Sequence, residues 1–267
     1  MTDTPEDEVL HRFESGVSWI TLNRPEAMNA VTWDQRERVI GLLAEASADP
    51  DVRAVVITAT GKGFCTGADL RGAPSAPAER IVGDVARMIR LGAQRLITAV
   101  LDCEKPVIAA VNGTAAGLGA HLALACDLVI AAEPARFIEV FVRRGLVPDA
   151  GGAYLLPRLI GPQKAKELMF FGDALPAAEA ERLGLVNKVV PAEALAETAR
   201  EWAERLAQGP TRALALTKQL VNASLDSDRA TALAAEATAQ ELNMSTADAN
   251  EGVAAFVERR TPKYLGR

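Results

Sequence analysis

Apolar and polar positions alternate near the start of the chain and then give way to longer apolar runs. Residues 9–13 and 18–22 predict a β-hairpin, because they flank a turn that contains glycine. Thr32 can cap the next segment, whose apolar residues follow one helical face as far as residue 49. Residues 54–59 are apolar and mostly β-branched, which is typical of a strand buried on both faces.

The same order of elements recurs further along the chain. Strands are predicted at residues 106–111 and 128–131, and a helix rich in small side chains lies between them at 116–125. A long helix is predicted over residues 79–101, after a small-residue linker at 72–77 that we expect to be mobile. Because strand, loop and helix repeat at similar intervals, we expect an α/β fold of stacked β-rich turns with helices outside.

The chain changes character beyond Pro191 and becomes almost wholly helical. The predicted helices cover residues 193–207, 211–222, 229–244 and 248–259. We place a boundary near residue 208, which divides a core of residues 1–207 from a C-terminal helical region of residues 208–267. This region has little core of its own, so we expect it to pack on the core and on neighbouring subunits.

Composition excludes several classes of function. The net charge of −6 and the scattered lysines and arginines give no footprint for nucleic acid. Residues 1–9 are acidic and polar, unlike a secretory signal, so a cytoplasmic location is expected. Residues 107–132 are apolar enough to resemble a membrane span, but Asn112, His121 and Asp127 interrupt them, and we expect no membrane association.

The cysteines and histidines argue against a metal site. The three cysteines form no CxxC pair, and we expect reduced, buried thiols, with Cys65 a packing residue. Only His11 and His121 are present, and neither an HExxH nor a GxSxG string occurs. Neither metal-assisted hydrolysis nor a serine triad is therefore predicted, and no metal is expected.

Two glycine-containing loops follow predicted strands. Residues 61–69 expose several backbone amides, and residues 112–120 lead into a helix whose amide dipoles converge on its start. A dinucleotide-binding loop is not predicted, because the third glycine of the first loop comes one position too late. Taken alone, each loop is weak evidence for function.

Five ordered blocks of the sequence resemble the crotonase, or enoyl-CoA hydratase/isomerase, superfamily. They are LNRPEAMNAV, GFCTGADL, KPVIAAVNGTAAGLGAHLALACDLVIA, GLVPDAGGAYLLPRLIG and AERLGLVNKVV. The resemblance implies a spiral of repeated ββα turns with a C-terminal helical trimerisation region, in a homotrimer or a dimer of trimers. It also implies an acyl-CoA thioester substrate and no separate cofactor, since CoA is part of the substrate.

In that family each of the two loops donates one backbone amide to the thioester oxygen, and the matching residues here are Ala68 and Leu118. Removing a proton beside a thioester builds negative charge on this oxygen, which two fixed amides can stabilise. Loss of one such donor typically costs roughly 3 to 4 kcal/mol of barrier. Gly67 and Gly117 would let the ligand approach the main chain closely.

The acid/base residues depart from those of the hydratases that the sequence resembles. Where those enzymes have two glutamates, this chain has His121 and Phe141. Asp149 is the candidate replacement, although from the sequence alone it could simply cap the following helix. By resemblance, an aspartate here is the base or nucleophile of several isomerases and dehalogenases. The GLVPDAGG segment looks most like ring-epoxide isomerases of phenylacetyl-CoA breakdown and related enoyl-CoA isomerases, and Gln94 stands where the dehalogenases have a histidine.

Other positions keep two interpretations. His121 is either a catalytic or substrate-contacting residue or a satisfied buried histidine. Glu139 could be a shifted second glutamate, but a displacement of two residues redirects the side chain, so a surface or structural role is favoured.

By resemblance, CoA and acyl groups bind at a wider set of residues. These are Arg24, Ala27, Met28, Thr66, Gly67, Ala68, Asp69, Leu70, Gly117 and Phe141. The favoured function is isomerisation through Asp149. Two alternatives remain: a hydratase that uses His121 or Asp149, and a catalytically silent acyl-CoA-binding protein. The acyl specificity would depend on residues 71–79 and on the helix that follows.

Overall fold

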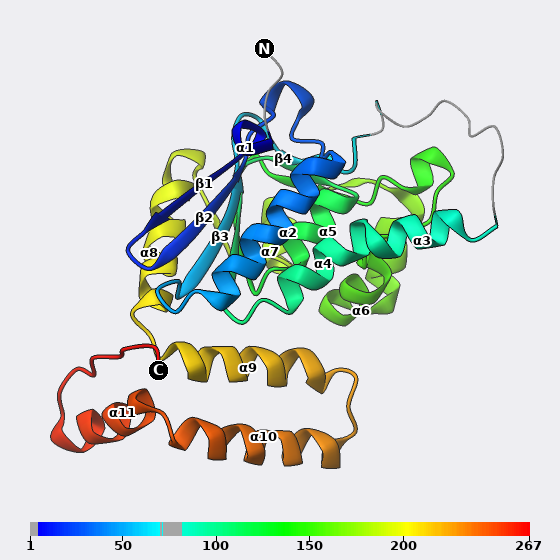
Figure 1. The fold of residues 1–267 in the computed structure, drawn as a ribbon. Helices are drawn as coiled ribbons and strands as arrows, with labels where there is room; N and C mark the ends of the chain where they lie inside the picture. The colour runs from blue at the N-terminus through cyan, green and yellow to red at the C-terminus, as the bar shows by residue number, and fades with distance from the viewer. Residues whose placement is uncertain (1–4, 70, 72–81) are drawn as a thin grey trace.

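The computed structural model in Figure 1 describes residues 5–69, 71 and 82–267. Several sequence predictions therefore fall outside the described residues. They are the predicted CoA contact Leu70, the small-residue linker at 72–77 and the first residues of the helix predicted to start at residue 79.

Six strands form the larger sheet, in the order β1-β2-β3-β5-β7-β10. The hairpin of β1 (Val9–Glu14) and β2 (Val17–Leu22) is antiparallel, as predicted. All other neighbours are parallel. The remaining strands are β3 (Ala54–Ala59), β5 (Val107–Val111), β7 (Leu128–Ala132) and β10 (Lys188–Val190).

A second sheet has the order β4-β6-β8-β9. Its strands are β4 (Gly63–Cys65), β6 (Thr114–Ala116), β8 (Arg136–Ile138) and β9 (Ala174–Pro176). The strand pairs β3/β4, β5/β6 and β7/β8 each contribute one strand to each sheet before the chain continues into a helix or a 3₁₀ turn. The predicted α/β fold of stacked ββα turns is confirmed.

Helices begin and end close to where the sequence predicts, with one exception. Helix α2 (Trp33–Ala48) starts with a capping box between Thr32 and Gln35. The single helix predicted at 79–101 is wrong, because α3 (Asp84–Leu91) and α4 (Ala93–Leu101) are separate. Gly92 divides them with a non-helical φ of −111° and ψ of −102°.

The larger sheet is buried on both faces. Val55 and Ile57 of β3 belong to the main core with residues of α2 and of α5 (Leu118–Ala125). Val56, pointing the other way, packs in a second cluster with α8 (Leu195–Ala207). Figure 1 shows α8 on the opposite side of the sheet from α2 and α4. The unbroken apolar run of β3 follows from this double coverage.

The remaining elements close the turns of the core. Helix α6 (Gly152–Phe171) is kinked at Gly161, which has φ 78°. The others are α1 (Pro5–Glu8), α7 (Ala177–Arg182) and the 3₁₀ turns η1 (Pro25–Ala27), η2 (Val142–Arg144) and η3 (Ala192–Ala194). None of the helices in the described residues is both long and apolar enough to span a membrane.

The C-terminal region consists of α9 (Thr211–Ser224), α10 (Arg229–Met244) and α11 (Ala247–Glu258). Helix α9 contacts the core through Lys218, whose Nζ donates to the carbonyl of Val100 at 3.0 Å. Figure 1 shows α10 on the far side of α9 from the core. Phe256 and Val257 of α11 are 85% and 73% exposed, so this region leaves a large apolar surface uncovered.

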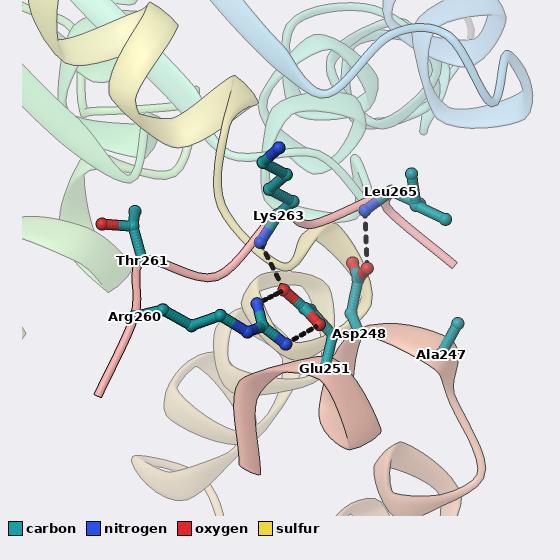
Figure 2. A pocket seen from close by; sticks show the side chains of 7 residues that line it. All are labelled: Ala247, Asp248, Glu251, Arg260, Thr261, Lys263 and Leu265. Atoms are coloured by element: carbon teal, nitrogen blue, oxygen red, sulfur yellow. Dashed lines mark hydrogen bonds and ion pairs between the residues drawn. The ribbon is translucent and has the colours of Figure 1, made fainter. Parts of the chain in front are cut away.

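The end of the chain folds back over the start of α11. The buried carboxylate of Asp248 accepts hydrogen bonds from the amides of Leu265 and Gly266, at 2.6 and 2.8 Å. Glu251 pairs with Arg260 beside it, as Figure 2 shows. A pocket of about 600 Å³ lies here, and it is lined by none of the residues predicted to carry chemistry. This pocket is therefore separate from the predicted donor loops.

Candidate active site

The two glycine-containing loops meet because their strands are neighbours. Strands β4 and β6 pair in parallel, with Cys65 opposite Ala115, so the segments after them leave the sheet side by side. A Cβ added to Gly67 would lie 3.3 Å from the carbonyl oxygen of Ala116 and 3.9 Å from the amide nitrogen of Leu118. The fold therefore brings the two predicted donor loops together.

Hydrogen bonds hold these loops on both sides of the predicted donors. The carbonyl of Gly67 accepts from Val31 at 2.8 Å, and the amide of Asp69 donates to Val31 at 2.9 Å. The amide of Gly117 donates to Ile138 at 2.9 Å. These bonds use the amides and carbonyls next to the predicted donors, and they fix the direction of each loop.

The two predicted donor amides have no backbone hydrogen-bond partner within the described residues. Leu118 is the first residue of α5, where a backbone N–H has no partner within the helix. Ala68 is exposed, and within the described part of the chain its amide has no hydrogen bond to a backbone carbonyl. Two such amides in neighbouring loops form the kind of site that can stabilise an oxyanion.

Asp149 lies in the loop between η2 and α6, and it does not cap the helix. The N-cap of α6 is Gly151, and no side chain accepts a hydrogen bond there, so the capping interpretation of Asp149 is wrong. Gln94 of α4 donates to the carbonyl oxygen of Asp149 at 3.3 Å and tethers this loop. Burial raises the pKa of the half-buried Asp149 carboxyl, and the positive charge of His121 partly opposes that rise.

His121 and Glu139 form a buried pair under this loop. The Nε2 atom of His121 lies 3.0 and 3.2 Å from the two carboxylate oxygens of Glu139. The ring of Phe141 stacks on the imidazole, with centroids 5.4 Å apart and planes within 12°. Glu139 is 5% exposed, so the expectation that it might lie on the surface is wrong.

The burial of His121 changes its interpretation. Its side chain is 0% exposed, so it does not contact a thioester in this conformation. It is also not a fully satisfied buried histidine, because within the described residues Nδ1 has no hydrogen-bond partner. Gly152, at the start of α6, packs so closely on the ring that an added Cβ would lie 2.1 Å from Nε2.

The segments predicted to contact CoA also come together. Met28 accepts hydrogen bonds from both the amide and the hydroxyl of Thr66, each at 3.2 Å. Arg24 is already occupied, because it pairs with Asp69 at 2.9 Å and with Glu8 at 3.4 Å. A phosphate contact by Arg24 therefore has to compete with these carboxylates.

Asn29 is a residue whose role the sequence did not reveal. Its side-chain amide donates to the carbonyls of Thr60 and Gly63, each at 2.8 Å, and its oxygen accepts from the amide of Arg24 at 2.7 Å. It thus fastens the predicted CoA segment to the first donor loop. The available sequence signal was the place of Asn29 in the LNRPEAMNAV block. In the structure Asn29 adopts a left-handed conformation with φ 54°, which asparagine tolerates.

Cys65 is not a nucleophile. It is completely buried beneath the donor loops, and burial raises the pKa of its thiol to about 12. The thiolate form is therefore negligible near neutral pH, and the packing role predicted for Cys65 agrees with its surroundings.

Known proteins resemble this chain over almost its whole length. A family model described as enoyl-CoA hydratase/isomerase matches residues 12–267. The 1,2-epoxyphenylacetyl-CoA isomerase of Escherichia coli is 39% identical, with 97% of this chain and 98% of that protein covered. The crotonyl-CoA hydratase of Syntrophomonas wolfei is 36% identical, with 98% and 99% covered.

Solved structures agree with this similarity. An enoyl-CoA hydratase from Bacillus anthracis superposes with a TM-score of 0.90 at 36% identity, covering 97% of this chain and all of that one. The names of these relatives include both an isomerase and hydratases, so the names alone do not distinguish the two activities.

Proposed function

The chain belongs to the enoyl-CoA hydratase/isomerase family, and we propose that it isomerises an acyl-CoA thioester by moving a proton through Asp149. One observation carries this proposal. Asp149 is a half-buried carboxyl whose pKa burial raises, and it lies three residues before Gly152, which packs on the ring of His121 one turn after Leu118 in α5. The positions of the two hydratase glutamates hold His121 and Phe141, both buried.

In the proposed reaction, the Asp149 carboxylate takes a proton from a carbon of the acyl chain. The electron pair of the broken C–H bond moves toward the thioester carbonyl and forms an enolate, whose oxygen accepts hydrogen bonds from the amides of Ala68 and Leu118. Asp149 then returns the proton to a different carbon. A double bond or ring bond is thereby shifted, and the composition of the substrate does not change.

Burial of Asp149 suits this role. An ordinary aspartate is too weak a base to take a proton efficiently near neutral pH, and desolvation increases its proton affinity. Gly67 keeps a side chain away from the amide of Leu118, since its added Cβ would lie 3.9 Å from that nitrogen. The CoA part would follow Ala27, Met28, Thr66 and Asp69, and no separate cofactor is required.

We also propose a homotrimer or a dimer of trimers as the functional form. The apolar side chains exposed on α11 support association, since Phe256 and Val257 have no partner in the described residues that buries them. These helices would cover one another or the core of a neighbouring subunit.

The test is deuterium uptake from heavy water into 3-enoyl-CoA, 2-enoyl-CoA and phenylacetyl-type CoA thioesters. We expect exchange and double-bond migration in the wild type and their loss in Asp149→Asn. Asp173→Asn is the matched control, because Asp173 is exposed and outside the donor loops. Water addition to crotonyl-CoA that survives Asp149→Asn would favour the hydratase instead. Binding of CoA esters without exchange would favour a silent binding protein.

A further inference from the structure

A buried ionisable pair lies next to the proposed base, and the proposed reaction does not use it. His121 comes from α5, one turn after the donor Leu118, and Glu139 comes from the segment after β8. Both side chains are almost inaccessible, at 0% and 5% exposure. Burying a carboxylate and an imidazole is costly unless the pair is matched, so this arrangement calls for a physical explanation.

The hydrogen bonds define where one proton lies. An ionised carboxylate only accepts, so the contacts of 3.0 and 3.2 Å require a proton on Nε2 of His121, which donates to Glu139. Nδ1 has no competing hydrogen-bond partner among the described residues. The stacked ring of Phe141 fixes the plane of the imidazole.

The imidazole also touches the loop that carries the base. Gly152 lies directly against Nε2, three residues after Asp149. Gln94 holds the carbonyl of Asp149 from the side of α4. His121 is close enough for its charge to lower the pKa of Asp149. The position and the charge of Asp149 therefore both depend on the imidazole ring of His121.

We propose that Glu139 and His121 are positioning residues for Asp149: Glu139 accepts from Nε2 and holds the imidazole in place, and the ring supports the start of α6 and with it the loop that carries the Asp149 carboxylate. This inference rests on the proposed role of Asp149 as the base. Neither His121 nor Glu139 needs to touch the substrate. Burial and the imidazolium act on Asp149 in opposite directions, and together they set the pH at which it becomes a base.

Few other titratable groups face His121. Cys65 lies on β4 beneath α5, and burial raises its thiol pKa to about 12, so it stays neutral. Strands β5 and β6 contribute no ionisable side chain, and the hydroxyl of Tyr154, near the start of α6, donates to the exposed Asp226 instead. Arg95 of α4 is exposed and pairs with Glu37 instead. The electrostatic effect is thus confined to Glu139, His121 and Asp149.

The test follows the titration of the Asp149 carboxyl by ¹³C NMR with labelled aspartate, assigned by its loss in Asp149→Asn. We expect Glu139→Gln and His121→Gln each to move this titration to higher pH, on the order of one unit. The double variant should move it no further than His121→Gln alone, because Glu139 acts through His121. Glu133→Gln, an exposed glutamate nearby in the chain, should leave it unchanged.

The pH dependence of kcat/KM gives the second measurement. Its acid limb should move in parallel with the carboxyl titration, with KM little changed. Lower thermal stability with no change in the Asp149 titration would overturn the inference and leave only a structural role for the pair. Additive shifts in the double variant would also overturn it, because Glu139 would then act independently of His121. The NMR titration needs no turnover, so it can support the coupling even if Asp149→Asn shows the proposed isomerase function to be wrong.

Discussion

Gly67 faces the amide nitrogen of Leu118 across the gap between the two donor loops, and a Cβ on Gly67 would lie 3.9 Å from that nitrogen. The same Cβ would lie 3.3 Å from the carbonyl of Ala116, and Gly67 has φ +108°, which side chains rarely permit. Any substitution here therefore alters the spacing of the two donors.

Gly67→Ala should lower kcat on the order of 100-fold, which corresponds to loss of one oxyanion donor. Steady-state kinetics on the substrate that shows exchange would measure it. Gly41→Ala is the control, because Gly41 lies within α2 and its added Cβ meets nothing within 4 Å. That variant should keep full activity and gain up to about 1 kcal/mol of stability from helix propensity. Equal activity of Gly67→Ala and wild type would contradict the oxyanion site.

Asp149→Asn should become more stable relative to the wild type as pH rises, even though it removes activity. Burial raises the folded-state pKa of Asp149, so its contribution to stability is present below the unfolded pKa and is lost as pH rises through the folded value. Asparagine carries no charge and escapes this loss. Urea unfolding from pH 4 to pH 8 should show the variant gaining on the wild type. A difference that is constant with pH would argue that Asp149 is not desolvated.

Lys218 joins the C-terminal region to the core through a largely buried ion pair. Its Nζ lies 2.9 Å from Asp127, whose carboxylate also accepts from the amide of Val107 at 2.7 Å. Burial raises the pKa of Asp127, and Lys218 opposes this rise. Lys218→Met would leave a buried carboxylate unpaired, and we expect a loss of about 3 kcal/mol in urea unfolding at neutral pH.

The matched control is Arg212→Met, on the same helix, because the Arg212–Glu104 pair is exposed. It should cost no more than about 1 kcal/mol. The loss in Lys218→Met should shrink as the pH is lowered and Asp127 becomes protonated. Equal losses of unfolding free energy for the two substitutions at neutral pH would show that burial does not make the Lys218–Asp127 pair more important for stability than the exposed pair.

The sequence predicted the hairpin, the central strands of the larger sheet and most of the helices, but not the four short strands of the second sheet. Residues 54–59 and 106–111 had to be buried strands, since unbroken apolar runs need cover on both faces. The capping box at Thr32 was visible from local chemistry alone. Asp149 was identified because a block of sequence around it resembles a known family.

Only the tertiary structure decided how side chains far apart in sequence meet. Glu139 and His121 pair because β8 lies beside β6 in the second sheet and α5 follows β6, which no local pattern shows. The break at Gly92 depends on packing as well, because a Cβ there would lie 2.6 Å from the carbonyl of Met88 and 2.7 Å from Arg36. Periodicity describes one element at a time, whereas the protonation and placement of the base depend on long-range contacts and burial.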